Sequence, residues 1–203
     1  MAETLLLHQM AMSGNCYKVR LVAHQLGLAL TLKDYSLHGG ETRTPEFLAK
    51  NPNGRVPLLE FGDGRVLAES GAILFHLSED TSLQPQDPWL RAQMLQWMFF
   101  EQYSHEPFVA VARFWLAYAP KDQLAKKQDR IAEWHDKGNA ALVVMEHHLQ
   151  RHDWFAGPGY SIADIALYAY THCAGEGGFD LAVYPALQRW LLRVAGQPGH
   201  IPL

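Results

Sequence analysis

One stretch near the start of the chain constrains its fold more than any other. Residues 13–20, Ser-Gly-Asn-Cys-Tyr-Lys-Val-Arg, separate a short apolar run at residues 4–8 from a segment in which apolar residues recur at helical spacing. The short run predicts a buried strand and the periodic segment predicts a helix. Ser13 and Asn15 are both good N-cap residues, and Gly27 supplies a stop signal. The sequence therefore predicts a sharp strand-to-helix turn.

Such a turn creates a place for a negatively charged group. The free N–H groups at a helix N-terminus carry about half a positive charge, and a hydroxyl there can donate a hydrogen bond to a thiolate. The arrangement resembles a thioredoxin active site, in which Cys-x-x-Cys opens the first helix, but Ser13 and Cys16 occupy the two Cys positions here. Because only one of the two positions is a cysteine, the motif cannot cycle between a dithiol and a disulfide. The remaining use of the site is to activate the thiol of another molecule. The alternative is that Ser13 only caps the helix.

Length and composition restrict the class of protein. A chain of 203 residues, 48% of them hydrophobic, can bury one large core or two small ones. The net charge of −4 and the scattered basic residues argue against a nucleic-acid partner. No apolar run is long enough to span a bilayer, and we expect neither a membrane partner nor a secretory leader. Cys16 and Cys173 make no disulfide framework, so a cytoplasmic location is expected.

The first part of the chain predicts a small α/β domain. Expected strands lie at residues 4–8, 28–35, 56–61 and 66–68. Residues 62–65, Gly-Asp-Gly-Arg, are a strong hairpin signal between the last two strands. Thr44 and Pro45 mark the start of a short helix, and Glu69 and Ser70 open a final one. The order β-α-β-α-β-β-α gives a mixed sheet flanked by helices.

The composition changes between residues 79 and 88, which are polar, include two prolines and show no periodicity. This pattern is typical of a linker. Beyond it the sequence shows only helical periodicity, at residues 89–118 (with a kink expected at Pro107), 121–150, 161–172 and 184–195. We therefore predict a thioredoxin-like α/β domain at residues 1–79, a linker at 80–88 and an all-helical (all-α) domain at 89–203.

Three motifs, in this order and over essentially the whole chain, resemble those of cytosolic glutathione transferases. Residues 13–20 resemble the serine-bearing motif of the zeta and theta-like classes, and residues 53–59, Asn-Gly-Arg-Val-Pro-Leu-Leu, resemble the glutathione-binding segment with its cis-proline. Residues 69–74, Glu-Ser-Gly-Ala-Ile-Leu, resemble the acidic-serine motif. The chain is similar to bacterial, serine-type members. It has Gly14 and Asn15 where the zeta class has Ser-Cys, which argues against zeta-type isomerase activity.

The resemblance implies glutathione as co-substrate, bound as an extended peptide on the N-terminal domain. Ser13 would donate a hydrogen bond to the glutathione thiolate, with Asn15 as a competing donor. If the bond before Pro57 is cis, the N–H and C=O of Val56 are exposed, and the cysteinyl part of glutathione can pair with them as an added strand. The alternative is a trans Pro57 that simply starts a strand.

The two ends of glutathione need partners of their own. Ser70 at a helix start can offer its N–H and hydroxyl to the γ-glutamyl carboxylate, and Glu69 can take the neighbouring ammonium. The alternative is that Glu69 and Ser70 merely cap the helix. For the glycine carboxylate, His38 and Arg55 are the best-placed candidates, although His38 is also explained by simple solvation at the surface.

Cys16 has two interpretations. It could form a mixed disulfide with glutathione, or it could be a buried structural residue one turn into the helix, which we favour because free Cys is among the most buried residue types. Ser161 and Asp164 predict a structural capping box with a buried carboxylate. His148 and His152 have a spacing that could hold a metal, but no third ligand is evident and no metal is expected.

The helical domain carries two further expectations. Its polar residues Tyr103, Glu106 and Arg113 are candidates for the pocket of the electrophilic substrate. The chain also has more apolar bulk than one small helical domain needs, in Phe61, Phe75, Trp89 and residues 97–100. Large apolar patches usually mark an interface, and the resemblance points the same way, so we expect a homodimer. The alternative is that these aromatic residues belong to the core of the monomer.

The sequence therefore predicts a glutathione transferase, in which the helix N-terminus and Ser13 stabilise the thiolate of glutathione for attack on an electrophilic small molecule. Two other functions stay open. The same site could serve a glutathione-dependent peroxidase or disulfide reductase. The scaffold could also serve a non-catalytic binding or regulatory protein, since fold does not fix function.

Overall fold

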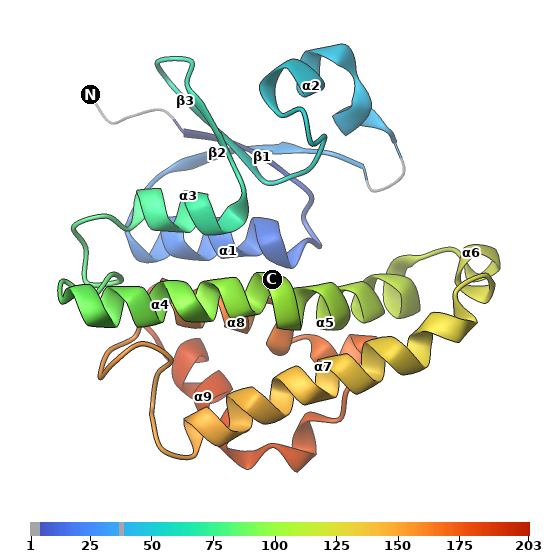
Figure 1. Ribbon diagram of the computed structural model, residues 1–203. Helices are drawn as coiled ribbons and strands as arrows, with labels where there is room; N and C mark the ends of the chain where they lie inside the picture. Colours follow the sequence, from blue (N-terminus) through green and yellow to red (C-terminus); the bar gives the residue numbers. More distant parts are fainter. Residues whose placement is uncertain (1–4, 37–38) are drawn as a thin grey trace. The chain divides into compact units, whose positions relative to one another are not determined.

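The computed structural model describes residues 5–36 and 39–203 (Figure 1). The chain divides into two compact units. The first unit ends at Thr81 and also includes Pro198–Leu203, and the second spans Ser82–Gln197.

The first unit has the predicted order of strands and helices. Its elements are β1 (Leu5–Gln9), α1 (Gly14–Gln25), β2 (Leu30–Asp34), a 3₁₀ turn (Glu41–Arg43), α2 (Pro45–Lys50), β3 (Leu58–Phe61), β4 (Val66–Ala68) and α3 (Ser70–Leu77). The sheet order is β2-β1-β3-β4, with β1 parallel to β2 and antiparallel to β3, and with β4 antiparallel to β3. Within this unit α1 and α3 cover one face of the sheet and α2 lies on the other (Figure 1). The predicted thioredoxin-like α/β fold is confirmed.

Strand register separates the two faces of this sheet. In β1, Leu5 and Leu7 are buried and pair with Phe61 and Leu59 of β3. Alternate residues of a strand point to opposite faces, so His8 lies on the other face from Leu7. The apolar face packs on α1 and α3, and this packing holds the two helices on the same side of the sheet (Figure 1).

A polar network connects the second face of the sheet to α2. The Nδ1 atom of buried His8 lies 2.8 Å from the Tyr35 hydroxyl, and its Nε2 lies 3.1 Å from Glu60 Oε2. Glu60 also pairs with Lys50 at the end of α2. Burial lowers the pKa of His8, and the hydrogen bond with Glu60 opposes that effect. The network holds α2, and with it the start of the loop that leads to β3.

The last residues of the chain return to α1 within the first unit. The Tyr17 hydroxyl donates to the carbonyl of Ile201 over 2.6 Å, and His24 Nδ1 lies 2.8 Å from the carbonyl of Gly199. The sequence pattern gives no sign of this return, because it depends on contacts between residues more than 170 positions apart.

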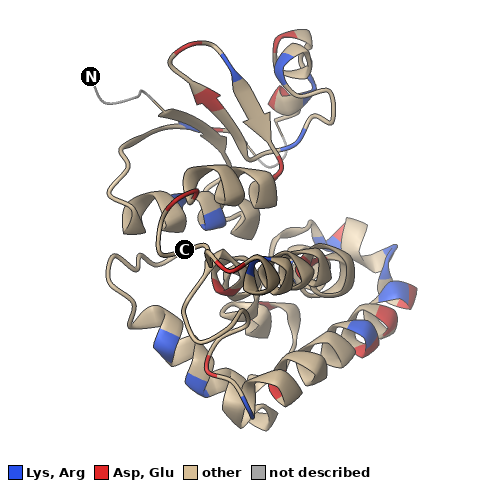
Figure 2. Ribbon diagram, turned by 60° about the vertical axis from the view of Figure 1, so that its left-hand side comes forward, with Lys and Arg blue, Asp and Glu red and all other residues tan. Residues whose placement is uncertain are grey.

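The second unit is helical throughout its described length. It contains α4 (Pro88–Phe100), α5 (Glu106–Arg113), α6 (Lys121–Ala125), α7 (Gln128–Leu149), α8 (Ile162–Thr171) and α9 (Pro185–Ala195), with 3₁₀ turns at Ala174–Gly177 and Leu181–Val183. Acidic and basic residues are interspersed along its helices (Figure 2). In α7, for example, Glu133 pairs with both Arg130 and Lys137. Among the described residues, no helix has the length and apolar character that crossing a membrane requires.

Two π-helical turns interrupt the first long helical segment of this unit, at Glu101–His105 and Phe114–Tyr118. Pro107 lies in the first turn of α5, directly after the first of these turns. A proline has no N–H to donate and is tolerated in the first turn of a helix. The irregularity expected at Pro107 takes the form of a π-helical turn directly before α5, one of the known interruptions of an α-helix.

The capping box at the start of α8 is the polar centre of this unit. Ser161 caps the helix, and its backbone N–H donates to Asp164 Oδ2 over 3.0 Å. The fully buried Asp164 carboxylate also accepts hydrogen bonds from the Phe155 N–H and from Trp190 Nε1 of α9, the latter over 2.9 Å. Burial raises the pKa of Asp164 to about 6, although these hydrogen bonds favour the ionised form. The predicted structural role of Asp164 is confirmed.

The raised pKa of Asp164 gives stability a defined dependence on pH. Below the unfolded-state pKa, about 3.9, the carboxyl group is neutral in both states. As the pH rises from about 4 to about 6, the folded protein keeps a proton that the unfolded chain has lost, so stability falls, by about 3 kcal/mol in total. Asp164→Asn lacks this titration. Urea unfolding should therefore show the stability of the wild type falling relative to Asp164→Asn across this range. A difference that does not vary with pH would contradict the assignment.

Candidate functional site

The predicted strand-to-helix turn is present between β1 and α1. Ser13 is the N-cap residue of α1 in an extended conformation, and its Oγ accepts a hydrogen bond from the Cys16 N–H over 3.3 Å. A hydroxyl that accepts one hydrogen bond still has its own proton to donate. The half-buried Ser13 hydroxyl can therefore cap the helix and donate a hydrogen bond to a thiolate at the same time.

Asn15 connects the start of α1 to the start of α3. Its Oδ1 accepts a hydrogen bond from Ser70 Oγ over 3.2 Å and another from Lys18 Nζ over 2.7 Å. Two predicted site residues, 55 positions apart in the chain, are thereby brought together. Lys18 was not among the sequence candidates. The available signal was a lysine three residues after Asn15 on the same predicted helix.

Glu69 precedes α3 in an unusual backbone conformation. Its φ is +69°, in the left-handed half of conformational space that residues other than glycine rarely adopt. Its exposed side chain makes no capping hydrogen bond to the helix. Strain of this kind persists where the surrounding structure imposes it, and it occurs often at ligand sites. A capping role alone therefore does not explain Glu69, whereas Ser70 beside it is buried and bonded to Asn15.

The loop before β3 contains the cis-proline that the sequence motif predicts. The Val56–Pro57 peptide bond is cis. The Asn51 side chain braces this loop, with Nδ2 donating to the Arg55 carbonyl over 2.8 Å and Oδ1 accepting from the Asn53 N–H. Within residues 5–36 and 39–203, no hydrogen bond uses the N–H or C=O of Val56. Arg55 is exposed in the same loop. The other candidate for the glycine carboxylate, His38, lies outside the described residues.

Both cysteines are buried. Cys16 is 0% exposed, and burial raises the pKa of its thiol, an effect that hydrogen bonds involving Met10 and Ser13 oppose. Burial raises the pKa of Cys173 to about 11. A thiol must ionise to act as a nucleophile. These surroundings favour the structural interpretation of Cys16 over a mixed disulfide with glutathione.

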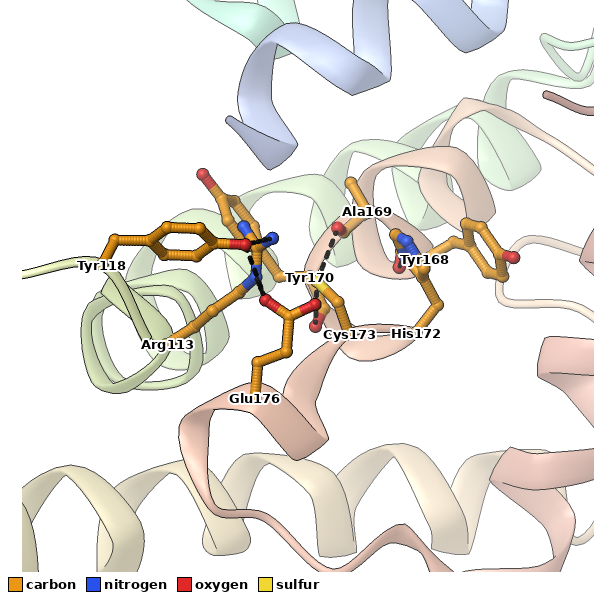
Figure 3. Close-up of polar contacts among 8 residues, drawn as sticks. All are labelled: Arg113, Tyr118, Tyr168, Ala169, Tyr170, His172, Cys173 and Glu176. Carbon is orange, nitrogen blue, oxygen red and sulfur yellow. Dashed lines mark hydrogen bonds and ion pairs between the residues drawn. The ribbon is translucent and has the colours of Figure 1, made fainter. Parts of the chain in front are cut away.

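The three candidates for the electrophile pocket have different surroundings. Arg113 is buried and donates to Glu176 Oε2 over 2.9 Å and to the Tyr118 hydroxyl over 2.7 Å. Tyr118 in turn donates to Glu176, which closes a triangle beside Cys173 (Figure 3). Tyr103 is 85% exposed and lines a largely apolar groove of about 630 Å³ between the π-helical turn and α7. Glu106 and Arg113 do not line this groove.

His148, at the end of α7, and His152, just beyond that helix, have a packing role. The ring of His148 stacks on those of His152 and Phe155, and its Nε2 lies 3.0 Å from the carbonyl of Trp154. Burial lowers the pKa of His148. In the part of the chain that the structure describes, no three His, Cys, Asp or Glu side chains are grouped so that they could hold a metal ion.

The burial of the cysteines predicts low thiol reactivity. In the native protein at about pH 7.5, an aromatic disulfide reagent should react with both thiols at least about a hundredfold more slowly than in the urea-unfolded chain. Absorbance of the released thiolate measures both rates. A thiol that reacts within seconds in the native protein would contradict this prediction, and Cys16→Ala and Cys173→Ala would identify it.

Comparison with known proteins adds to this geometry. Residues 3–79 match the family model described as "Glutathione S-transferase, N-terminal domain", and residues 99–198 match the corresponding C-terminal domain. A glutathione S-transferase structure from Pseudomonas fluorescens is 49% identical, covers 98% of both chains and has a TM-score of 0.94.

Two further relatives are informative about ligand and reaction. A glutathione transferase structure from Burkholderia graminis, described with two glutathione molecules bound per protein subunit, is 28% identical over 97% of this chain and 85% of that one, with a TM-score of 0.82. The disulfide-bond oxidoreductase YfcG of Escherichia coli is 29% identical over 93% of this chain and 89% of the relative.

Proposed function

The chain belongs to the glutathione S-transferase family, and from this premise we propose that it binds glutathione on its first unit and transfers it to an electrophilic small molecule. The observation that carries the proposal is the hydrogen bond between Asn15 and Ser70. It joins the N-termini of α1 and α3, which are the expected partners of the glutathione thiol and of the γ-glutamyl carboxylate.

The thiol lies at the start of α1 in this proposal. The helix N-terminus, the Ser13 hydroxyl and the Asn15 amide stabilise the thiolate, so the thiol releases its proton to solvent and needs no general base. The sulfur then forms a bond to an electrophilic carbon while that carbon loses a leaving group or passes its electron pair to a conjugated acceptor. The raised pKa of buried Cys16 supports glutathione, and not the protein, as the source of the sulfur.

The rest of the peptide has partners along the same unit. The N–H and C=O of Val56, which make no hydrogen bond within residues 5–36 and 39–203, suit the cysteinyl backbone of an extended peptide, which would add to the sheet as a short strand. The Ser70 hydroxyl already donates to Asn15, so the backbone N–H groups of α3 bind the γ-glutamyl carboxylate. Exposed Glu69 pairs with the ammonium, and Arg55 with the glycine carboxylate.

Removal of a side chain that donates a hydrogen bond to the thiolate should slow the reaction without weakening the binding of glutathione. We expect Ser13→Ala and Asn15→Ala each to lower kcat by ten- to a thousandfold, roughly the cost of one lost donor to a developing anion. Calorimetry should show little change in the Kd for glutathione. Asp87→Ala, which removes the N-cap of α4 in the second unit, is the control for loss of a helix cap. A fully active Ser13→Ala enzyme would exclude the hydroxyl as a donor.

Glu69 should act on binding and not on chemistry. Glu69→Gln removes the charge opposite the ammonium and should raise the Kd for glutathione by about tenfold, the value of one charge-assisted hydrogen bond. The value of kcat at saturating glutathione should stay within about twofold. Glu79→Gln makes the same charge change at another exposed site of the first unit and should alter neither. An unchanged Kd in Glu69→Gln would leave Glu69 with a structural role only.

Reduction of disulfides is the second candidate function, and the similarity to the E. coli disulfide-bond oxidoreductase supports it. Because the protein's own thiols are buried, both electrons must come from glutathione. The bound thiolate attacks one sulfur of the substrate disulfide, forms a mixed disulfide and releases the other sulfur as a thiol. A second glutathione thiolate then resolves the mixed disulfide, giving oxidised glutathione and the second thiol.

A substrate panel distinguishes these functions. Purified protein that is retained on immobilised glutathione should be assayed with electrophiles, hydroperoxides and mixed disulfides. Turnover of electrophiles alone supports conjugation, and oxidation of glutathione by disulfides or hydroperoxides supports the reductase or peroxidase function. Binding without any turnover would favour a non-catalytic role, and failure to bind glutathione would overturn the proposal.

We also propose that the protein is a homodimer. Of the aromatic residues expected at an interface, Phe61 and Trp97 are buried within their own units. Trp89 and Phe99 on α4 are 70% and 68% exposed, and Tyr103 follows them on the π-helical turn. Large exposed aromatic side chains along one helical segment favour association, and a two-fold pair is the commonest arrangement.

Sedimentation equilibrium at micromolar concentration tests the dimer. We expect twice the mass of one chain for the wild type and the mass of one chain for Phe99→Glu. Val183→Glu, which places the same charge at an exposed site far along the second unit, should remain dimeric. A wild-type protein that sediments as a monomer while it conjugates glutathione would exclude a requirement for the dimer.

A further inference from the structure

We propose that Arg20 is a positioning residue of the thiol site, which holds the turn before α1 so that the Ser13 hydroxyl meets the glutathione sulfur. This inference rests on the proposed function and assigns a role to the last residue of the 13–20 motif, for which neither the motif nor the relatives supply one. It starts from a chain of three side chains, Arg20, Gln9 and Asp34, which connects α1 to the ends of β1 and β2.

The chemistry of the three side chains fixes the direction of each hydrogen bond between them. A guanidinium group only donates, so the Gln9 atom that meets Arg20 Nη1 is the carboxamide oxygen. A carboxylate only accepts, so Gln9 Nε2 donates to Asp34 Oδ1, over 2.8 Å. Gln9 also stands directly opposite Asp34 in the pairing of β1 with β2. Both ends of one carboxamide are thus used to link a helix to two strands.

Gln9 occupies a place on the sheet that an apolar residue would suit. Because side chains alternate along a strand, Gln9 lies on the same face of β1 as the buried Leu5 and Leu7. It is only 3% exposed, and a buried carboxamide is costly unless its polar atoms are hydrogen-bonded. The bonds with Arg20 and Asp34 offset that cost. A leucine would pack on this face without polar partners, but it would give Arg20 no acceptor.

Arg20 also holds the turn that leads into the helix. Its Nη2 donates to the Ala11 carbonyl over 2.9 Å, while Nη1 donates to Gln9. The two nitrogens belong to one rigid, planar group, so the turn is held in a fixed relation to the end of β1. The Ser13 N–H donates to the Met10 carbonyl over 3.0 Å, which ties the N-cap to the same turn. A shift of Ala11 would therefore carry the Ser13 hydroxyl with it.

The position of the Ser13 hydroxyl matters for the reaction more than for binding. A catalytic group displaced by about 1 Å can lose about a hundredfold in rate. The partners proposed for the rest of glutathione lie at the start of α3 and in the loop before β3, away from the turn that Arg20 holds. Arg20 should therefore affect the state and the reaction of the thiol, and leave the affinity for the peptide nearly unchanged.

The first test compares Arg20→Lys with the wild type, because lysine keeps the positive charge and loses the rigid fork. The ultraviolet absorbance of the glutathione thiolate, followed against pH with protein in excess, gives the pKa of the bound thiol. We expect Arg20→Lys to raise that pKa by about one unit and to lower kcat about tenfold. Calorimetry should show a Kd for glutathione within about threefold of wild type.

A matched control makes the same exchange elsewhere in the first unit. Arg65→Lys, in the exposed hairpin between β3 and β4, should leave the thiol pKa, kcat and Kd unchanged. If Arg20 contributed only its charge, Arg20→Lys would behave like the wild type as well. That result would overturn the positioning role.

A double-mutant cycle tests whether Arg20 acts through Ser13. If it does, Arg20→Lys should have a smaller effect on the thiol pKa and on kcat in the Ser13→Ala background than in the wild type, because coupled residues are not additive. A change that merely loosens the fold would affect both backgrounds equally. Fully additive effects would therefore overturn the inference.

A second variant reaches the same chain of side chains from its exposed end, and it replaces Arg20→Lys if that protein does not fold. Asp34→Ala removes the acceptor for Gln9 Nε2 at an exposed position of β2. It should lower kcat at an unchanged Kd for glutathione, by a smaller factor than Arg20→Lys, since the bond to Ala11 is kept. Asp34→Asn keeps an oxygen in that place and should lose less of kcat. A wild-type kcat in Asp34→Ala would exclude the link through Gln9.

The outcomes separate this inference from the function on which it rests. If the wild type lowers the pKa of bound glutathione and Arg20→Lys does so equally, the inference fails and the proposed function stands. If the wild type binds no glutathione, both fail. An Arg20→Lys protein that binds glutathione normally, but has a raised thiol pKa and a lower kcat that depend on Ser13, supports the inference.

Discussion

The hydrogen bond from Ser70 Oγ to the Asn15 side-chain oxygen connects the starts of α1 and α3, and the candidate site depends on that connection. The apolar face of the sheet brings the two helices together, but packing alone does not align their N-termini. Ser70 Oγ does so by donating to the Asn15 side-chain oxygen, which also accepts a hydrogen bond from Lys18 Nζ on its own helix. Ser13 and Asn15 at the start of α1 and Ser70 at the start of α3 are thereby held at one place, which suits a peptide that carries a thiol and a carboxylate.

The surroundings of the protein's own sulfurs explain why a second molecule must supply the reactive thiol. Cys16 lies one turn inside α1, and burial raises its pKa. Cys173 lies beside the Arg113, Tyr118 and Glu176 triangle of the second unit, and burial raises its pKa to about 11 (Figure 3). The hydroxyl of Ser13 stands where a thioredoxin has its first cysteine. In a thioredoxin the helix N-terminus activates a thiol of the protein itself. Here the N-terminus of α1 can instead activate the thiol of a bound molecule.

The features of the fold and site that could be predicted from the sequence are those that depend on residues close together in the chain. The turn before α1, the hairpin between β3 and β4 and the Ser161–Asp164 capping box depend on residues close in sequence, and all three are present. The return of residues 198–203 to α1 and the burial of Arg113 against Glu176 depend on distant partners. Lys18 was missed because periodicity treats a lysine as a surface residue, whereas here its aliphatic stem is buried and its ammonium group meets Asn15.

A crystal structure of the protein with glutathione tests the account most directly. We predict an extended peptide whose cysteinyl N–H and C=O pair with Val56, whose α-carboxylate meets the N-terminus of α3, and whose sulfur lies within about 3.5 Å of Ser13 Oγ or Asn15 Nδ2. The Asn15 oxygen should keep its bonds to Lys18 and Ser70. Glutathione ordered elsewhere, or with its sulfur turned away from the start of α1, would contradict the account.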